Sequence, residues 1–346
     1  MNNIYKYSGF PFVKTNELQK KIIHKIMNLQ KNNFYSEKNP CLCKQDNSIQ
    51  ISQRCRFGLN INFKLCKNCG VIRQDPIMTE VSTKEFYKNF YRKLYTGKDD
   101  DENKEEIFKS QYLSGEKYYY LIKSELLKKN YLLKNQKNIL EIGSSCGGIL
   151  KFFFDNKHNV YALDYDQEYI DFGKKKGITN VYNDINKIEK KFNLIILSHT
   201  LEHFKNLKQN IKLIEKILEE DGFIFLDLPG IFNFDYYHLR NLLYDYKRIH
   251  FLYHLQNAHN YYFIKETFTN FIINNTELEI IYIDEKINCI LKKSKKKKVN
   301  KNLYDKKSYR KILSFIRLNH FRYFLLKNIR FVLIPINEIK KYFLKK

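Results

Sequence analysis

The sequence lacks any apolar run long enough to cross a membrane. Its 346 residues contain no uninterrupted apolar stretch approaching the roughly 20 residues that a transmembrane helix needs. Residues 1–12 lack the basic start and the apolar core of a secretory signal peptide, and no internal repeat is visible along the chain. We therefore expect a cytoplasmic protein.

Acidic residues are scarce, with 37 Asp and Glu against 62 Lys and Arg, so that the formal net charge is +25. Such a charge resembles that of a nucleic-acid-binding protein, but its distribution argues against this. Residues 291–346 contain 19 Lys and Arg and two Asp and Glu, which is +17 of the total and leaves only +8 for the other 290 residues. The excess belongs to the C-terminal tail, and we do not expect a nucleic-acid partner.

Five of the seven cysteines lie between residues 41 and 69. Clustered cysteines without an export signal favour a metal site over disulfides. Two short motifs, Cys-x-Cys and Cys-x-x-Cys-Gly, are separated by 22 residues and contain Cys41, Cys43, Cys66 and Cys69. Four thiolates suit a structural zinc ion, and Gly70 relieves the turn that follows the second motif. Cys55 is a possible replacement ligand, and incidental buried cysteines are the alternative to a metal site.

The chain changes character near residue 136. Before it, an apolar pattern over residues 18–27 predicts a helix, and residues 76–135 read as Tyr-rich helices broken near 96–103. After it, short apolar runs alternate with helical segments. The predicted strands are 139–142, 160–163, 181–182, 194–197 and 223–226, and the predicted helices are 149–154, 169–176 and 207–218. This alternation predicts a parallel sheet covered on both faces, with Gly222 ending the last helix and with 278–283 and 287–291 as a closing hairpin.

The segment Asn138–Gly148 contains Glu-x-Gly-x-x-x-Gly between a predicted strand and a predicted helix. Gly143 lets the chain turn sharply and lets a ligand approach the backbone, and Gly147 allows close packing where the helix begins. Ligands of such sheets bind at the carboxyl ends of the strands. The alternative is an ordinary strand-to-helix turn that contains small residues.

Two acids favour a cofactor site over an ordinary turn. Asp164 ends the next strand, where an acid can accept hydrogen bonds from two ribose hydroxyls, and Asp184 follows the third strand, within reach of an adenine amino group. A dinucleotide site would have glycine in the place of Ser145. The carboxylate of Glu141 at the strand end also repels a pyrophosphate but suits a cofactor that carries a sulfonium and an ammonium group.

Residues 136–231 resemble the class I methyltransferases that depend on S-adenosylmethionine (SAM). The run Phe192–Phe204 resembles the fourth strand of that family, and Asp227–Gly230 resembles the end of its fifth. The resemblance implies that Glu141 supports the amino group side of SAM, that the glycines line its methionine portion and that Asp164 binds its ribose. The predicted cofactor-binding residues are Glu141, Gly143, Ser145, Gly147, Asp164, Asp184 and Ser198.

Residues 66–95 resemble part of the N-terminal zinc-binding module that precedes some bacterial sugar methyltransferases. The likeness rests on Cys-x-x-Cys-Gly, on Pro76-Ile-Met and on the aromatic stretch from Glu85 to Tyr95. It implies a closed, structural zinc site with the ligands Cys41, Cys43, Cys66 and Cys69, and it leaves Cys55 out. Cys146, inside the glycine-rich segment, is expected to contribute only volume.

A hydroxyl acceptor needs a base when it takes the methyl group, and histidine suits that role near neutral pH. Three histidines compete, and each has a structural hydrogen bond as its alternative role. We favour His259, just before a helix expected near Lys265, then His199 and then His203. In the sugar C-methyltransferases that carry the zinc module, the matching stretch is Glu-His followed by aromatics. Here Ala258 replaces the acid, which favours O-methylation.

The tail combines the basic run Lys292–Lys298 with a mixture of aromatic and basic residues. This composition fits a helix that lies in a membrane interface better than one that crosses it. Basic residues there would contact an anionic leaflet, which would place the protein at the inner face of the membrane. The alternative is a helix packed on the catalytic domain with a solvated basic face.

The sequence thus predicts an α/β protein with a Rossmann-like, seven-stranded methyltransferase sheet, a zinc-ribbon module and a helical basic tail. We expect five parts, namely an N-terminal helical segment 1–39, a zinc module 40–75, a helical connector 76–135, a SAM domain 136–293 and a tail 294–346. The expected activity is methylation of a nucleotide- or lipid-linked sugar in surface-polysaccharide or lipopolysaccharide biosynthesis. The alternatives are a sugar C-methyltransferase, an RNA or other small-molecule methyltransferase, and a non-catalytic membrane-associated assembly protein that keeps the fold.

Overall fold

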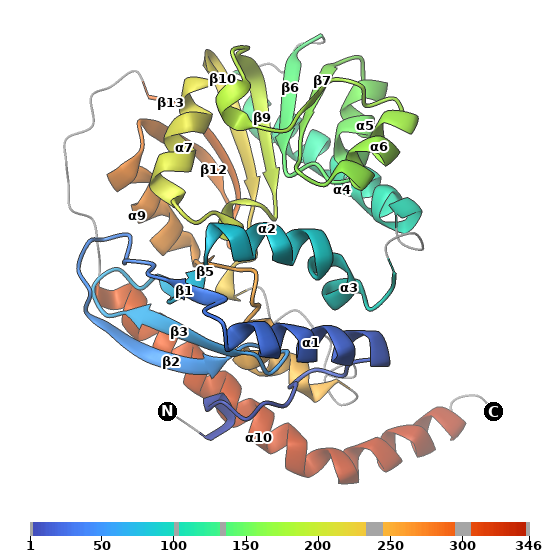
Figure 1. Ribbon diagram of the computed structural model, residues 1–346, viewed down its shortest axis with the longest axis vertical. Helices are drawn as coiled ribbons and strands as arrows, with labels where there is room; N and C mark the ends of the chain where they lie inside the picture. The colour runs from blue at the N-terminus through green and yellow to red at the C-terminus, as the bar shows by residue number, and fades with distance from the viewer. Residues whose placement is uncertain (1–2, 100–103, 132–135, 233–244, 295–305, 344–346) are drawn as a thin grey trace. The chain divides into compact units, whose positions relative to one another are not determined.

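A computed structural model describes residues 3–99, 104–131, 136–232, 245–294 and 306–343 (Figure 1). The chain forms two compact units that interleave along the sequence. The first contains residues 1–79, 231–262 and 304–346, and the second contains residues 80–230 and 263–303. Each unit is therefore built from separated stretches of the chain.

The second unit is built on a seven-stranded mixed sheet. Its strands, in the order in which they lie side by side, are β12 (Leu278–Ile283), β13 (Asn288–Lys293), β10 (Leu218–Asp227), β9 (Phe192–Ser198), β6 (Asn138–Ile142), β7 (Asn159–Leu163) and β8 (Val181–Tyr182). The strands from β10 to β8 run parallel, and β13 joins β10 antiparallel to begin the closing hairpin. The predicted α/β class and the sheet of seven strands are confirmed.

Helices flank this sheet on both sides (Figure 1). They are α2 (Glu80–Asn89), α3 (Tyr91–Thr96), α4 (Lys104–Leu127), α5 (Gly148–Asp155), α6 (Gln167–Lys175), α7 (Leu207–Lys216) and α9 (Lys265–Asn275), with the short 3-10 turns η3 (Ile185–Lys187) and η4 (Leu201–His203). Buried side chains of α4 and α5, including Ile122, Leu126 and Phe153, pack with the apolar strands in one core. Residues 100–103, within the predicted break, lie outside the described residues.

The prediction for residues 207–222 is wrong at its end. α7 stops at Lys216, and Leu218 already begins β10. Gly222 does not end the helix but lies inside β10, where a Cβ would stand 2.9 Å from the carbonyl oxygen of Phe192. This glycine therefore permits close backbone approach within the sheet. The pattern misled because an apolar residue at position 218 suits the last turn of a helix and the start of a strand equally.

The first unit holds two small sheets and two long helices. One sheet pairs β1 (Tyr35–Glu37) with β5 (Ile77–Met78), and the other has the order β11 (Tyr261–Tyr262), β4 (Ile72–Gln74), β3 (Asn60–Cys66) and β2 (Ser48–Arg54). α1 (Glu17–Gln30) confirms the helix predicted over residues 18–27. It begins at a capping box in which the Asn16 side chain accepts from the Gln19 amide at 2.9 Å and the Gln19 side chain accepts from the Asn16 amide at 3.0 Å.

The tail forms one long helix, α10 (Lys306–Phe343), and residues 295–305, which include part of the predicted basic run, lie outside the described residues. Within the first unit, α10 contacts the short turns η6 (Tyr246–Ile249) and η7 (Phe251–His254). Nε2 of His250 lies 3.0 Å from Nδ1 of His320, and burial lowers the pKa of both rings. A third short turn, η1 (Asn3–Tyr5), supplies an aromatic ring against His250. None of the helices in the described ranges has the length and apolar character of a membrane span.

Candidate functional site

The loop after β6, residues 143–147, is held tightly against the end of β9. The Gly143 amide donates to the Leu163 carbonyl at 2.8 Å, and its φ of +77° is one that side chains rarely adopt. A Cβ on Gly143 would stand 2.5 Å from Oγ1 of Thr200. Gly147, with φ +74°, starts α5. We call residues 143–147 the cofactor loop, and only glycine fits its first position.

Glu141 lies just before the cofactor loop as a buried carboxyl group, 1% exposed. Its Oε2 atom has no hydrogen-bond partner among the described residues. Burial, and then the negative charge of Asp164, raises the pKa of this carboxyl well above its ordinary value. A cation bound beside it would satisfy the open oxygen and restore the charged form. The donor set thus fits a cationic ligand and opposes a pyrophosphate.

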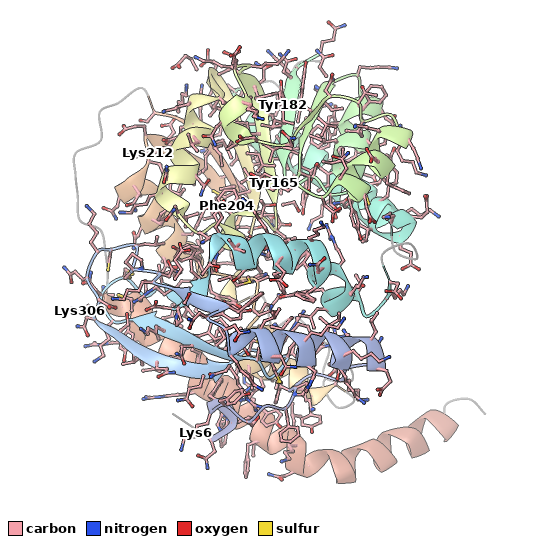
Figure 2. All side chains as sticks on the ribbon, in the orientation of Figure 1. Lys6, Tyr165, Tyr182, Phe204, Lys212 and Lys306 are labelled. Carbon is pink, nitrogen blue, oxygen red and sulfur yellow. The ribbon has the colours of Figure 1, made fainter. Side chains whose placement is uncertain are left out.

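Asp164, at the end of β7, is fixed by backbone amides. Its Oδ2 accepts from the Ser145 amide at 2.6 Å, and its Oδ1 accepts from the amides of Tyr165 at 2.7 Å and Asp166 at 3.0 Å. A carboxylate has about four lone-pair positions, so at least one remains for a ligand hydroxyl. Tyr165, labelled in Figure 2, follows directly and is 76% exposed. The structure thus joins the predicted ribose acid to the cofactor loop.

Asp184 and Ser198 occupy the ends of two other parallel strands. Asp184 caps η3, where its Oδ1 accepts from the amide of Asn186 at 2.9 Å, and such bonds hold its pKa below the ordinary value. Ser198 ends β9, and its Oγ lies 3.0 Å from the hydroxyl of Tyr118. Tyr118 also donates to Asp227 at the end of β10. The roles of Asp184 and Ser198 in binding a cofactor stay predictions.

The sequence analysis missed two residues that the fold brings to this edge of the sheet. Tyr118 comes from α4, and Arg92 comes from α3. Nη2 of Arg92 donates to Oγ of Ser145 at 2.7 Å, and its guanidinium lies 4.5 Å from the ring centre of Tyr169. Arg92 therefore places a fixed positive charge on the cofactor loop. The only sequence signal was its position in the aromatic stretch 85–95, which carries no spacing that points to the loop.

His199 and His203 lie within the second unit, directly after β9. His199 has a left-handed backbone with φ 49°, and its ring nitrogens lie 3.7 Å from Glu202 and 3.8 Å from Asp227. Desolvation opposes protonation of the ring, but the hydrogen bond to Glu202 and the two negative charges raise the pKa of His199 to about 9. Nδ1 of His203 lies 2.8 Å from the hydroxyl of Tyr87 on α2.

His259 belongs to the first unit, where its side chain is 5% exposed. It precedes β11, which pairs with β4 through the register Tyr261 with Arg73 and Tyr262 with Ile72. The ring of His259 lies 5.4 Å from that of Tyr262. The Asn260 carbonyl accepts from the Gln74 amide at 3.0 Å, so the histidine segment is fastened to the sheet. The catalytic role of His259 stays a prediction.

The first unit also brings together the four predicted zinc ligands, Cys41, Cys43, Cys66 and Cys69. Their sulfur atoms all lie within 4.8 Å of one another, and the closest three pairs are 3.4, 3.5 and 3.7 Å apart. Tetrahedral zinc with Zn–S bonds of about 2.3 Å requires sulfurs roughly 3.8 Å apart. The spacing therefore fits a metal ion, and the four side chains are free thiols rather than disulfides.

The backbone around this cluster supports the same chemistry. The Asn68 amide points at Sγ of Cys66 at 3.4 Å, and the Gly70 amide donates to the Cys66 carbonyl at 3.0 Å with φ +73° at the glycine. Amides directed at sulfur stabilise thiolates. Cys55 is fully buried but lies outside the cluster, and burial raises the pKa of its thiol to about 11.

Comparison with known families decides what the second unit carries. Residues 115–281 match the model of a family described as a methyltransferase domain. The chain contains a SAM-dependent methyltransferase domain. No curated protein matches the chain. The assignment agrees with the cofactor loop, the buried Glu141 and the ribose acid Asp164 described above.

Solved structures similar to the chain are methyltransferases as well. Coclaurine N-methyltransferase bound to S-adenosylhomocysteine (SAH) is 18% identical over 27% of this chain and 31% of that chain, with a TM-score of 0.25. A SAM-dependent methyltransferase from Clostridium acetobutylicum is 19% identical over 44% and 60%, with a TM-score of 0.31. The plantazolicin methyltransferase BpumL with SAH is 15% identical over 54% and 76%, with a TM-score of 0.39. The chain thus spans less than two thirds of the first two, and such distant likeness carries no information about the acceptor.

The residues at the edge of the methyltransferase domain fit SAM group by group. The buried Glu141 suits the positive charges of the cofactor, and Asp164 suits its ribose hydroxyls. Arg92 adds a charge of the sign that the methionine carboxylate requires. The cofactor supplies an activated methyl group, and the protein supplies orientation and a site from which water is excluded.

Proposed function

We propose that this protein transfers a methyl group from SAM to a sugar hydroxyl during the synthesis of a surface polysaccharide or lipopolysaccharide. The acceptor would be a nucleotide- or lipid-linked sugar. The methyltransferase domain supports the reaction type, and the likeness of residues 66–95 to the module of bacterial sugar methyltransferases supports the acceptor class. The structural zinc ion would hold that module together.

One observation carries the proposal furthest, namely the attachment of the His259 segment to the four-cysteine module. β11 follows His259 and pairs with β4, which begins two residues after Gly70. The hydroxyl of Tyr261 donates to Oδ1 of Asn39 at 2.7 Å, just before Cys41. The module thus holds the favoured base at a fixed place, which is what the recognition of an acceptor requires.

The buried polar side chains of this segment favour an acceptor rich in hydroxyl groups. Asn257, His259 and Asn260 are at most 5% exposed, and Gln74 on the neighbouring strand is fully buried. Both polar atoms of the Gln74 amide lack a hydrogen-bond partner among the described residues. Buried amides are costly when unsatisfied, and sugar hydroxyls can donate to them and accept from them.

We favour His259 over His199 as the base that takes the proton from the acceptor hydroxyl. A pKa of about 9 keeps His199 protonated at neutral pH, so that it holds no free lone pair for the proton. His199 instead forms a positively charged link between Glu202 and Asp227. Ala258, next to His259, leaves out the carboxylate of the C-methyltransferases and agrees with transfer to oxygen.

A strain that lacks the gene tests the proposal for any sugar acceptor. Mass spectrometry of its surface glycan should show the loss of one methyl group from a sugar, and the wild-type gene should restore it. The His259→Ala variant should not restore it, because removal of a general base slows transfer by about 10²- to 10⁴-fold. The matched control is His24→Ala, an exposed histidine on α1.

Two results would contradict parts of the proposal separately. An unchanged glycan in the deletion strain would remove the sugar as acceptor. Full restoration by His259→Ala would remove His259 as the base while leaving the sugar in place. Purified His259→Ala protein should still bind SAH, because the predicted cofactor residues lie on other stretches of the chain.

A further inference from the structure

α10 presents apolar side chains on a face that no part of the described chain covers. Leu318, Phe321, Leu325 and Ile329 recur every three or four residues and are 45, 57, 42 and 43% exposed. This spacing places them on one stripe of the helix. Phe324, 56% exposed, lies beside them. We call these five residues the outer stripe.

The opposite face of α10 is already occupied. Ile312, Ile316, Tyr323 and Leu326 are at most 9% exposed, and α10 contacts η6 and η7 within the first unit. The ring of Tyr323 stacks on Tyr246 at 5.4 Å between centres. The inner face therefore accounts for the folding of the helix, and the outer stripe needs another explanation because packing within the chain does not use it.

The charge of the helix indicates what would cover the outer stripe. Residues 306–329 contain seven Lys and Arg and no Asp or Glu. Arg322 follows Leu318 by one helical turn, and Arg317 precedes Phe321 by one turn, so that cations accompany the stripe along its length. Long basic side chains can lay their stems on an apolar surface while the charged ends reach phosphate groups.

We propose that the outer stripe of α10 binds the surface of an anionic phospholipid membrane. The helix would lie in the plane of the interface, with the stripe among the acyl chains and with Arg317 and Arg322 at the headgroups. A second copy of the same face is a poorer partner, because two helices of uniform positive charge repel each other. This attachment is independent of the proposed activity and would hold the enzyme where lipid-linked acceptors are present.

Vesicle flotation of the full-length protein tests the proposal. The protein should float with vesicles of phosphatidylcholine and phosphatidylserine and should remain in solution with phosphatidylcholine alone. Phe321→Glu combined with Leu325→Glu should abolish flotation. The matched control is Leu113→Glu combined with Leu127→Glu, which changes two side chains of α4 that are 64 and 58% exposed. This control should float like the wild type.

A second variant tests the charges without a change in the stripe. Arg317→Gln combined with Arg322→Gln should weaken binding roughly thirtyfold, because each basic residue near an anionic surface contributes about fivefold. Circular dichroism should show that each variant keeps its helix content. Equal flotation of wild type and both α10 variants, or no flotation of the wild type, would overturn the proposal. So would a dimer, seen by light scattering without lipid, that the stripe variant dissociates in place of any lipid binding.

Discussion

Replacing Asp164 by alanine is expected to weaken the binding of SAM by about a hundredfold. The carboxylate ends β7 and is held by the amides of Ser145, Tyr165 and Asp166, so that it is fixed before a ligand arrives. A ribose with two hydroxyls would form charged hydrogen bonds to it, and the loss of such bonds costs roughly 3 kcal/mol in total. Equilibrium dialysis with labelled SAM measures this change directly.

The same carboxylate also orders the cofactor loop, so a control for folding is needed. Asp171→Ala removes an equally acidic side chain from the exposed face of α6, where it bonds to Gln167 and Lys174. This variant should bind SAM like the wild type. Thermal unfolding should show that both variants fold. If Asp164→Ala folded and bound SAM as tightly as Asp171→Ala, the ribose assignment would be wrong.

Replacing Cys69 by serine should cause the largest loss of stability, because it should remove the metal ion from the first unit. The four sulfurs lie on segments that meet only in the fold, namely the turn around residues 41–43 and the end of β3. Zinc bound by four thiolates contributes on the order of 10 kcal/mol to the folding of small modules. We expect one zinc ion per wild-type chain by elemental analysis, none in Cys69→Ser, and a lowered first unfolding transition.

Cys55→Ser is the matched control for this experiment. It changes a fully buried cysteine of the same unit that lies outside the cluster. This variant should lose some stability from the burial of a hydroxyl but should keep one zinc ion per chain. Retention of zinc by Cys69→Ser, or its loss from Cys55→Ser, would contradict the assignment of the four ligands.

The sequence predicted features that depend on neighbours along the chain. The alternation of apolar runs with helical segments predicted the sheet, because each strand and helix must bury its own apolar face. Gly143 and Asp164 were found because a sharp turn after a strand and an acid at the end of the next strand are local patterns. The four cysteines were found by spacing alone, and the fold brings them together.

Other features depend on contacts between distant segments, which no local pattern encodes. Arg92 reaches Ser145 across 53 positions, and Tyr118 reaches Asp227 across 109. The two interleaved units arise because residues 231–262 return to the N-terminal sheet, where only two residues of β11 form the pairing. A two-residue strand is too short to produce a recognisable alternation. The inner and outer faces of α10 were equally hidden, since both are apolar.

Calorimetric titration of the full-length protein with SAH and, separately, with NAD tests the central claim most directly. The cofactor loop and the buried Glu141 carboxyl suit a cationic nucleoside and repel a pyrophosphate. We predict that one molecule of SAH binds per chain and that NAD produces no binding heat. Binding of NAD, or the absence of any SAH binding by the folded protein, would contradict the account of this site.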